Sequence, residues 1–213
     1  MIKIKDLTYS YNGTPVIANL SFSFLSSKIY MITGENGSGK TTLLRIILGI
    51  LKPKSGYIQF EEKAVISYLP DHNGLYEDLS ITDNIKFRLA LYKQSFNAIQ
   101  NEYYSLLNRY HLYDKKDEPI SSLSLGMKKK AAIIATILVN ANVYVFDEPT
   151  GGVDHEAKIE IISLFKSMNL KQKYILIVTH DEELLSQIPS VLLKMQEGRL
   201  MEWKRCISSW KKS

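Results

Sequence analysis

The segment GENGSGKT, at residues 34–41, matches the pattern G-x-x-x-x-G-K-[ST]. Residues 29–33 before it are apolar without alternation, as in a buried parallel strand, and residues 41–51 after it read as a helix ended by Pro53. Glycines let successive N–H groups converge on phosphate oxygens, and the helix N-terminus adds its positive dipole end. Lys40 would reach the phosphates and Thr41 would bind Mg²⁺. A chance glycine turn is the alternative, which average composition gives in roughly one chain in a hundred.

Two adjacent carboxylates, Asp147 and Glu148, follow a second buried apolar run at residues 143–146. In parallel sheets the carboxyl ends of strands meet beside such a loop. Asp147 can hold Mg²⁺, and Glu148 can orient or deprotonate an attacking water. An acidic pair at a strand end is usually structural when it stands alone. Its combination with the phosphate-binding loop favours a site for phosphoryl chemistry.

Strands and helices alternate along the chain, which predicts an α/β fold with a mainly parallel sheet. Residues 81–113 carry apolar side chains at helical spacing and predict helices inserted into that pattern. Further helices are expected at 128–139 and 156–168, and further strands at 2–5, 20–25, 174–178, 191–193 and 199–201. A turn is expected at 11–13.

Composition is that of an ordinary globular chain, with 45% hydrophobic and 23% charged residues. The sequence contains none of the roughly 20-residue apolar runs that a spanning helix needs. Of the net charge of +5, +3 falls in residues 201–213, so the basic character is mostly terminal. The single cysteine, Cys206, cannot form an internal disulfide, which indicates a reducing compartment.

Three stretches resemble the motifs of ABC ATPases. DEPTGGVD, at residues 147–154, is similar to the Walker B and D-loop run of that family, and residues 179–181, THD, resemble its switch-histidine motif. LSLGM, at residues 123–127, sits where the family places its LSGGQ signature. The resemblance covers nearly the whole chain, and every motif is in the family's order.

The resemblance implies a P-loop NTPase core with a mainly parallel sheet, a small antiparallel β subdomain and an inserted α-helical subdomain. Residues 1–202 would form a single ABC ATPase domain with the helical subdomain at about 78–139, and residues 203–213 a basic tail. In that tail Trp203, Ile207 and Trp210 share one helical face, which favours either packing on the body or contact with a membrane-facing partner.

The resemblance also implies roles for individual residues. Two cassettes would face each other head to tail, with ATP between one P-loop and the opposite signature. The residues expected to bind nucleotide are Tyr11, Gly34, Glu35, Asn36, Gly37, Ser38, Gly39, Lys40, Thr41, Thr42, Ser124, Gly126 and Asp154. Glu148 and His180 would be catalytic, and Thr41, Asp71 and Asp147 would hold Mg²⁺.

Two departures from the family pattern matter for the site. In the signature, Leu125 replaces a glycine and Met127 replaces the glutamine, whereas the phosphate-contacting Ser124 and Gly126 are kept. In the Q-loop, Asp71 takes the place of the usual glutamine, which adds a charge to an acidic site.

The function expected from the resemblance is the ATP-hydrolysing subunit of an ABC transporter, with export favoured by the signature and by residues 68–71. Its partners would be an integral membrane permease and a second ABC ATPase subunit, identical or different, at the cytoplasmic face of the cell membrane. The alternative is a soluble ABC ATPase acting on a cytosolic or nucleic-acid partner, although no nucleic acid is expected. A P-loop kinase is a third reading, which the signature and His180 disfavour.

Overall fold

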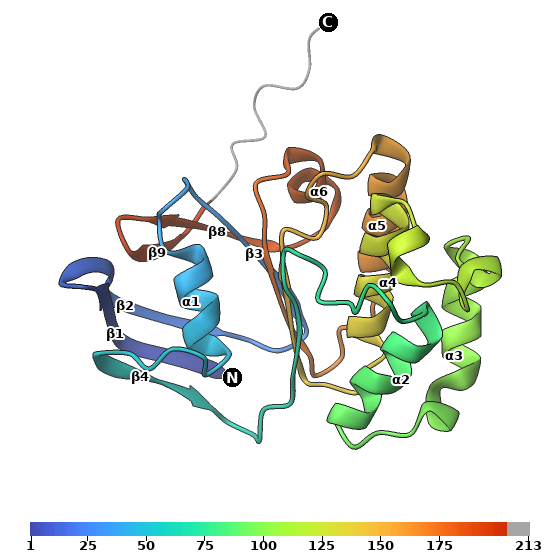
Figure 1. Ribbon diagram of the computed structural model, residues 1–213. Helices are drawn as coiled ribbons and strands as arrows, with labels where there is room; N and C mark the ends of the chain where they lie inside the picture. The colour runs from blue at the N-terminus through green and yellow to red at the C-terminus, as the bar shows by residue number, and fades with distance from the viewer. Residues whose placement is uncertain (204–213) are drawn as a thin grey trace, which may run out of the picture.

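A six-stranded, mainly parallel sheet forms the centre of the molecule in the computed structural model, which describes residues 1–203 (Figure 1). Its strand order is β5-β6-β7-β3-β8-β9, and only the β8–β9 pair is antiparallel. The strands are β3 (Lys28–Thr33), β5 (Ile66–Leu69), β6 (Val143–Asp147), β7 (Tyr174–Val178), β8 (Val191–Gln196) and β9 (Arg199–Glu202). Strands β3 and β6 are separated by β7, so their carboxyl ends lie two strands apart.

The three central strands are continuous apolar runs because each buries both of its faces. Side chains in a strand alternate between the two sides of the sheet. In β6, Tyr144 and Phe146 join one hydrophobic core, and Val143 and Val145 join the other. The first core contains the helices that cover one face of the sheet, and the second contains the antiparallel sheet and α1. The apolar runs at residues 29–33, 143–146 and 174–178 therefore predicted the right strands.

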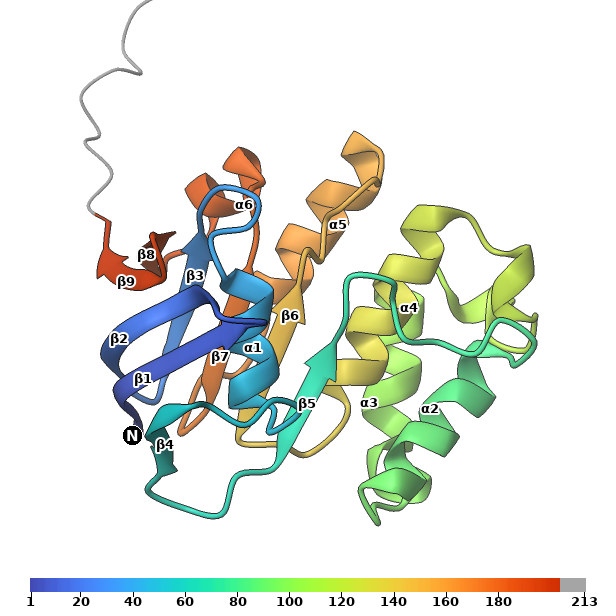
Figure 2. The same cartoon turned by 60° about the vertical axis from the view of Figure 1, so that its left-hand side comes forward.

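A smaller antiparallel sheet of order β2-β1-β4 covers the other face together with α1 (Figure 2). It consists of β1 (Ile2–Tyr11), β2 (Thr14–Phe24) and β4 (Ser55–Phe60). Strands β1 and β2 are joined by a two-residue turn in which Asn12 and Gly13 both have positive φ, 46° and 87°. Such turns match the twist of a hairpin. Tyr11 is the last residue of β1, next to this turn, and it lines the same cleft as the first residues of α1.

Helices α2, α3 and α4 lie together on the side of the central sheet away from the small sheet (Figures 1 and 2). The helices are α1 (Lys40–Ile47), α2 (Ile81–Leu91), α3 (Phe96–Arg109), α4 (Leu125–Ile137), α5 (His155–Lys166) and α6 (Glu182–Gln187), with short 3₁₀ turns at Tyr113–Lys115 and Ile120–Ser122. This arrangement confirms the predicted fold class, an α/β core with a mainly parallel sheet, a small antiparallel sheet and inserted helices.

Several predicted helix boundaries were wrong. Helix α1 stops at Ile47 rather than at residue 51, because Gly49 takes a left-handed φ of 71° and donates to the carbonyl of Ile46. Helix α4 begins at Leu125, three residues early, because the Ser124 side chain caps it. Helix α6 was not predicted. The basic tail predicted for residues 203–213, with Ile207 and Trp210, lies outside the described residues except for Trp203.

Candidate functional site

The loop between β3 and α1 passes so close to strand β8 that only glycine fits at its start. A Cβ added to Gly34, whose φ is 152°, would lie 2.3 Å from the carbonyl oxygen of Met195. Gly39, with φ 104°, is the N-cap of α1, and a Cβ there would lie 2.9 Å from the Met195 side chain. Two of the pattern's glycines thus set the path of the loop and bring it to the N-terminus of α1.

Polar groups of this loop are arranged for an anion. The Lys40 ammonium donates to the carbonyl oxygens of Gly34 and Glu35, at 2.7 and 2.9 Å, which draws its charge over the loop. The Ser38 hydroxyl is buried without a hydrogen-bond partner among the residues that the structure describes. An unpaired buried hydroxyl is costly unless a ligand or water satisfies it. The loop and the first turn of α1 therefore fit a phosphate chain.

The two predicted carboxylates lie at the end of β6 and differ in their surroundings. Asp147 is 6% exposed, whereas the Glu148 side chain is 18% exposed and its Oε1 lies 2.9 Å from Nδ1 of His180. Glu148 has a left-handed φ of 46°, which is uncommon for a residue with a side chain. Its N–H donates to the carbonyl of Val178 in β7, and its own carbonyl accepts from Gly151. The neighbouring strand and turn therefore hold this conformation in place.

Burial and neighbouring carboxylates raise the pKa of Asp147 to about 6. Burial is the largest cause, and the negative charges of Glu148 and Asp71 add to it. Lys129 and Lys40 act in the opposite direction. A site of this kind favours a cation, because a positive charge relieves both the burial cost and the repulsion.

The loop and the carboxylates share one cleft of about 640 Å³. Its lining includes ten of the residues predicted from sequence: Tyr11, Asn36, Gly37, Gly39, Lys40, Thr41, Thr42, Asp71, Asp147 and Glu148. It also includes residues that the sequence did not indicate, among them Val16, Arg45 and His72. These come from β2, α1 and the turn after β5, and they carry no motif of their own.

Other predicted residues lie around this cleft rather than in its lining. Glu35 and Ser38 line a neighbouring hollow of about 550 Å³. His180 lines a third hollow, of about 440 Å³, together with Glu148 and residues 150–153. Within the part of the chain that the structure describes, Ser124, Gly126 and Asp154 line none of these three hollows. Ser124 and Asp154 cap the N-termini of α4 and α5, and a Cβ on Gly126 would lie 2.6 Å from that of Ala157.

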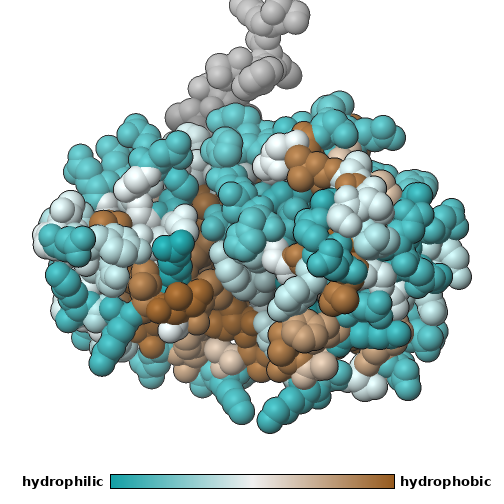
Figure 3. All heavy atoms as spheres, in the orientation of Figure 1, coloured by the Kyte–Doolittle hydropathy of each residue, from teal (hydrophilic) through white to brown (hydrophobic). Residues whose placement is uncertain are grey.

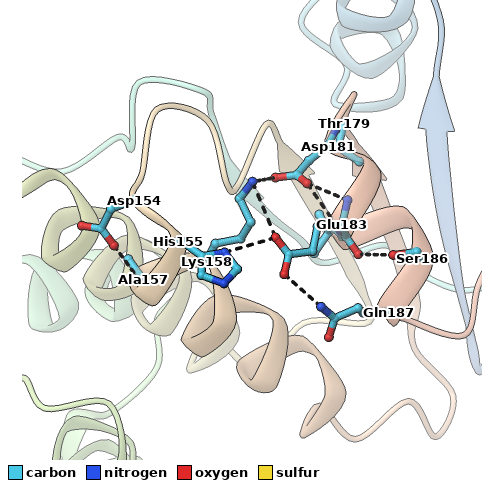
Figure 4. A network of polar contacts seen from close by, with 10 residues as sticks. Asp154, His155, Ala157, Lys158, Thr179, Asp181, Glu183, Ser186 and Gln187 are labelled. Atoms are coloured by element: carbon cyan, nitrogen blue, oxygen red, sulfur yellow. Dashed lines mark hydrogen bonds and ion pairs between the residues drawn. The ribbon is translucent and has the colours of Figure 1, made fainter. Parts of the chain in front are cut away.

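A polar network joins α5 to α6 (Figure 4). Its residues Lys158, Asp181 and Glu183 line the same hollow as His180. The Lys158 ammonium lies 2.9 Å from an oxygen of Asp181 and 3.9 Å from one of Glu183. The other Asp181 oxygen accepts from the N–H groups of Glu183 and Leu184 and so caps α6. Burial alone would raise the pKa of Asp181, but these hydrogen bonds outweigh it and the pKa is lowered. The network therefore holds the segment that follows β7 and contains His180 against α5, the helix that begins directly after residues 147–154.

These features define a P-loop nucleoside triphosphatase: a glycine-rich loop opens a helix and lies next to two carboxylates at the end of a parallel strand. The family described as ABC transporter matches residues 17–151, and this chain belongs to that family. It is therefore an ABC ATPase that binds and hydrolyses ATP. The predicted resemblance and the predicted fold are confirmed, and the kinase reading is wrong.

Similar proteins serve transport in both directions. The chain is 33% identical to the zinc import ATP-binding protein ZnuC of Buchnera aphidicola subsp. Baizongia pistaciae, over 84% of this chain and 74% of that protein. It is 27% identical to the SkfA peptide export ATP-binding protein SkfE of Bacillus subtilis, over 95% and 88%. Among solved structures, CbiO1 of Clostridium perfringens, part of the ABC transporter complex CbiONQ, matches with a TM-score of 0.78 and 29% identity, over 94% and 86%.

The Lys158 bridge predicts a pH-dependent contribution to stability. Replacing Lys158 by Met should lower the free energy of unfolding at pH 7 by about 1 kcal/mol, because Asp181 and Glu183 lose their shared cation. Since the pKa of Asp181 is lowered on folding, its contribution is present above its ordinary value of 3.8 and is lost as the pH falls through the folded-state pKa. Urea denaturation of both proteins at several pH values measures this: the difference should shrink below pH 3.8.

Lys166→Met is the matched control, since Lys166 lies on the same helix and its ammonium donates to the neutral amide oxygen of Gln187, at 3.2 Å. Its effect should stay within about 0.5 kcal/mol. Equal destabilisation by the two substitutions would contradict the ion-pair account.

Proposed function

We propose that this chain is the ATP-hydrolysing subunit of a transporter whose membrane-spanning part is a separate permease, and that it drives export. Its place would be the cytoplasmic face of the cell membrane. The observation that carries the proposal is a group of exposed hydrophobic side chains on α2 and the segment before it, which a permease can use. None of the helices within residues 1–203 is long and apolar enough to cross a membrane. Export is favoured by the LSLGM signature and by residues 68–71, YLPD.

Glu148 is the proposed general base for hydrolysis. Its carboxylate lines the cleft that holds Lys40 and Thr41, so a water next to the terminal phosphate would lie within its reach. His180 lies 2.9 Å from Glu148 and would hold that carboxylate in position while contacting the same phosphate. Lys40 and the N–H groups of residues 34–41 would bind the phosphate oxygens and stabilise charge as it shifts to the leaving group.

Mg²⁺ is the proposed cofactor, since the cleft offers oxygen donors of the kind that this hard cation prefers. The Thr41 hydroxyl, Asp147 and Asp71 line the cleft and would hold it. When bound it would neutralise phosphate charge. The raised pKa of Asp147 is consistent with a cation partner at this carboxylate.

Tyr11 is the proposed adenine contact. It is 41% exposed, lines the cleft, and makes a T-shaped contact with Tyr9, with ring centroids 5.0 Å apart at 80°. A partly exposed aromatic ring at the cleft can stack on a base. Gly34, Glu35, Asn36, Gly37, Ser38, Gly39 and Thr42 would complete the nucleotide contacts through the loop and α1.

A second ABC ATPase subunit would complete each site. Ser124 and Gly126 lie at the N-terminus of α4 and Asp154 at that of α5, outside the chain's own ATP cleft. Helix N-termini attract anions, so these residues would serve the nucleotide bound by the partner cassette. In this proposal residues 1–202 are one ABC ATPase domain with its helical subdomain at about 78–139, and residues 203–213 are a basic tail.

The permease would dock on exposed hydrophobic side chains of α2 and of the segment before it. Phe87 and Leu91 share one face of α2 and are 41% and 67% exposed. Tyr76 is 55% exposed and packs edge-on against Phe87, with ring centroids 5.1 Å apart. Hydrophobic residues also gather in the region between α1 and α2 on the face seen in Figure 3. Exposed apolar groups of this size are typical of interaction sites.

Replacing Glu148 by Gln should preserve ATP binding and lower the rate of hydrolysis by about 100-fold or more, because an amide cannot accept the proton of the attacking water. Phosphate release under saturating MgATP measures the rate. Light scattering should then reveal an ATP-dependent doubling of mass, because unhydrolysed ATP holds two cassettes together. Glu102→Gln, at an exposed carboxylate of α3, is the control and should turn over normally. Undiminished turnover by Glu148→Gln would move the role of base to another residue.

Affinity purification of the tagged chain from detergent-solubilised membranes tests the transporter assignment. An integral membrane protein should co-purify in fixed stoichiometry, and the Tyr76→Ser/Phe87→Ser variant should lose it. Tyr57→Ser, which removes a similarly exposed aromatic from β4, should retain it. Co-purification of nucleic acid or of a soluble protein instead would favour the soluble ABC ATPase.

A further inference from the structure

The middle lysine of the KKK run at residues 128–130 is buried against the catalytic site. Lys129 lies on α4, and its side chain is only 2% exposed. Its ammonium donates to the backbone carbonyl of Asp71 at 2.6 Å and to that of Glu148 at 3.1 Å. One side chain thus joins three segments: the signature helix, the turn after β5 and the end of β6. None of the roles assigned above uses Lys129.

Burial of a lysine in this place carries a large desolvation cost unless partners compensate for it. The compensation here comes from the two carbonyls and from the Asp71 carboxylate, 3.9 Å from the ammonium. Asp71 itself is 70% exposed and shares the cleft with Asp147 and Glu148. The buried ammonium therefore places a positive charge that interacts with the carboxylates of Asp71, Glu148 and Asp147.

Lys129 contacts the backbone of Glu148, which has an unfavourable conformation. Glu148 has a left-handed φ of 46°, and its carbonyl accepts from Lys129 on one side and from the N–H of Gly151 on the other, at 3.1 Å. A conformation of this kind persists only when its surroundings hold it. The direction of the Glu148 carboxylate follows from this backbone, since the side chain starts at the strained residue.

We propose that Lys129 is a positioning residue for ATP hydrolysis: its buried ammonium ties the Asp71 turn to the backbone of Glu148 and offsets the negative charge that Asp71 adds to the site. The inference rests on the catalytic role proposed for Glu148. It also accounts for the aspartate at position 71, because a carboxylate there has a cation within reach.

Lys130 provides a matched control. It is the next residue on α4, its side chain is 8% exposed, and it is also a lysine bonded to a carbonyl and a carboxylate. Its partners, Tyr110 and Glu160, do not line the ATP cleft. Loss of either lysine should lower stability, whereas only loss of Lys129 should change the site.

The first measurement compares the kinetics of Lys129→Met and Lys130→Met in the full chain. Lys129→Met should lower kcat by about 10- to 100-fold, since a misplacement on the order of 1 Å costs about that much. ATP affinity, measured with a fluorescent analogue, should change by less than about threefold, because the ammonium of Lys129 bonds to the backbone carbonyls of Asp71 and Glu148 rather than to the phosphate-binding loop. Lys130→Met should keep kcat within about twofold of the wild type. Where Lys129→Met does not fold, Lys129→Gln takes its place.

The second measurement does not depend on activity. The turn that contains Asp71 has two internal hydrogen bonds, from the amide of Asn73 to the carbonyl of Pro70 at 3.1 Å and from the amide of Gly74 to the carbonyl of His72 at 2.9 Å. The exchange rates of these two amides measure how well the turn is held. Hydrogen exchange of these amides should be about fivefold or more faster in Lys129→Met than in Lys130→Met. Adding Asp71→Gln to Lys129→Gln should restore part of the lost kcat, because the uncompensated carboxylate is then removed.

The proposal is overturned if Lys129→Met hydrolyses ATP within twofold of the wild type, if exchange at the turn is unchanged, or if the double variant recovers nothing. A wild-type chain without ATPase activity would instead refute the proposed function, while the exchange measurement would still test the link between Lys129 and the turn.

Discussion

The close approach of the phosphate-binding loop to strand β8 is the constraint on which the site depends. With the Met195 carbonyl 2.3 Å from where a Cβ of Gly34 would lie, the chain has one path from β3 into α1. That path leaves the Ser38 hydroxyl buried without a partner among residues 1–203 and brings Lys40 over the loop carbonyls. The buried strands hold the loop rigidly, and in the proposed site the loop would set where the phosphates of ATP bind.

Negative charge is the second organising feature, and a buried lysine from outside the phosphate-binding loop partly offsets it. Asp147, Glu148 and Asp71 share one cleft, and burial together with the repulsion from the other two carboxylates raises the pKa of Asp147 to about 6. Lys129 approaches the same group from α4. Because α4 also begins with Ser124, the helix proposed to face a partner's nucleotide is hydrogen-bonded directly to the backbone of Glu148, the proposed general base. Under these proposals, α4 would link hydrolysis physically to the pairing of two cassettes.

Sequence patterns predicted the local parts of this arrangement well. The apolar runs at 29–33, 143–146 and 174–178 are strands because burial on both faces leaves no polar alternation. The early end of α1 was missed, because the left-handed residue Gly49 competes with the apolar pattern that continues to residue 51. The burial of Lys129 could not be predicted, since it depends on carbonyls 58 and 19 residues away in sequence. Val16 and His72 reach the cleft for the same reason: tertiary structure, not a motif, places them there.

The most direct test of the central claim is MgATP binding and hydrolysis by the purified chain and by Lys40→Ala, measured by calorimetry and phosphate release. The wild type should bind and hydrolyse ATP. The variant should bind at least about tenfold more weakly, because a charge-assisted hydrogen bond to phosphate contributes roughly 1.5–3 kcal/mol, and it should lose hydrolysis. Normal hydrolysis by Lys40→Ala would contradict the assignment of residues 34–41 as the phosphate-binding loop.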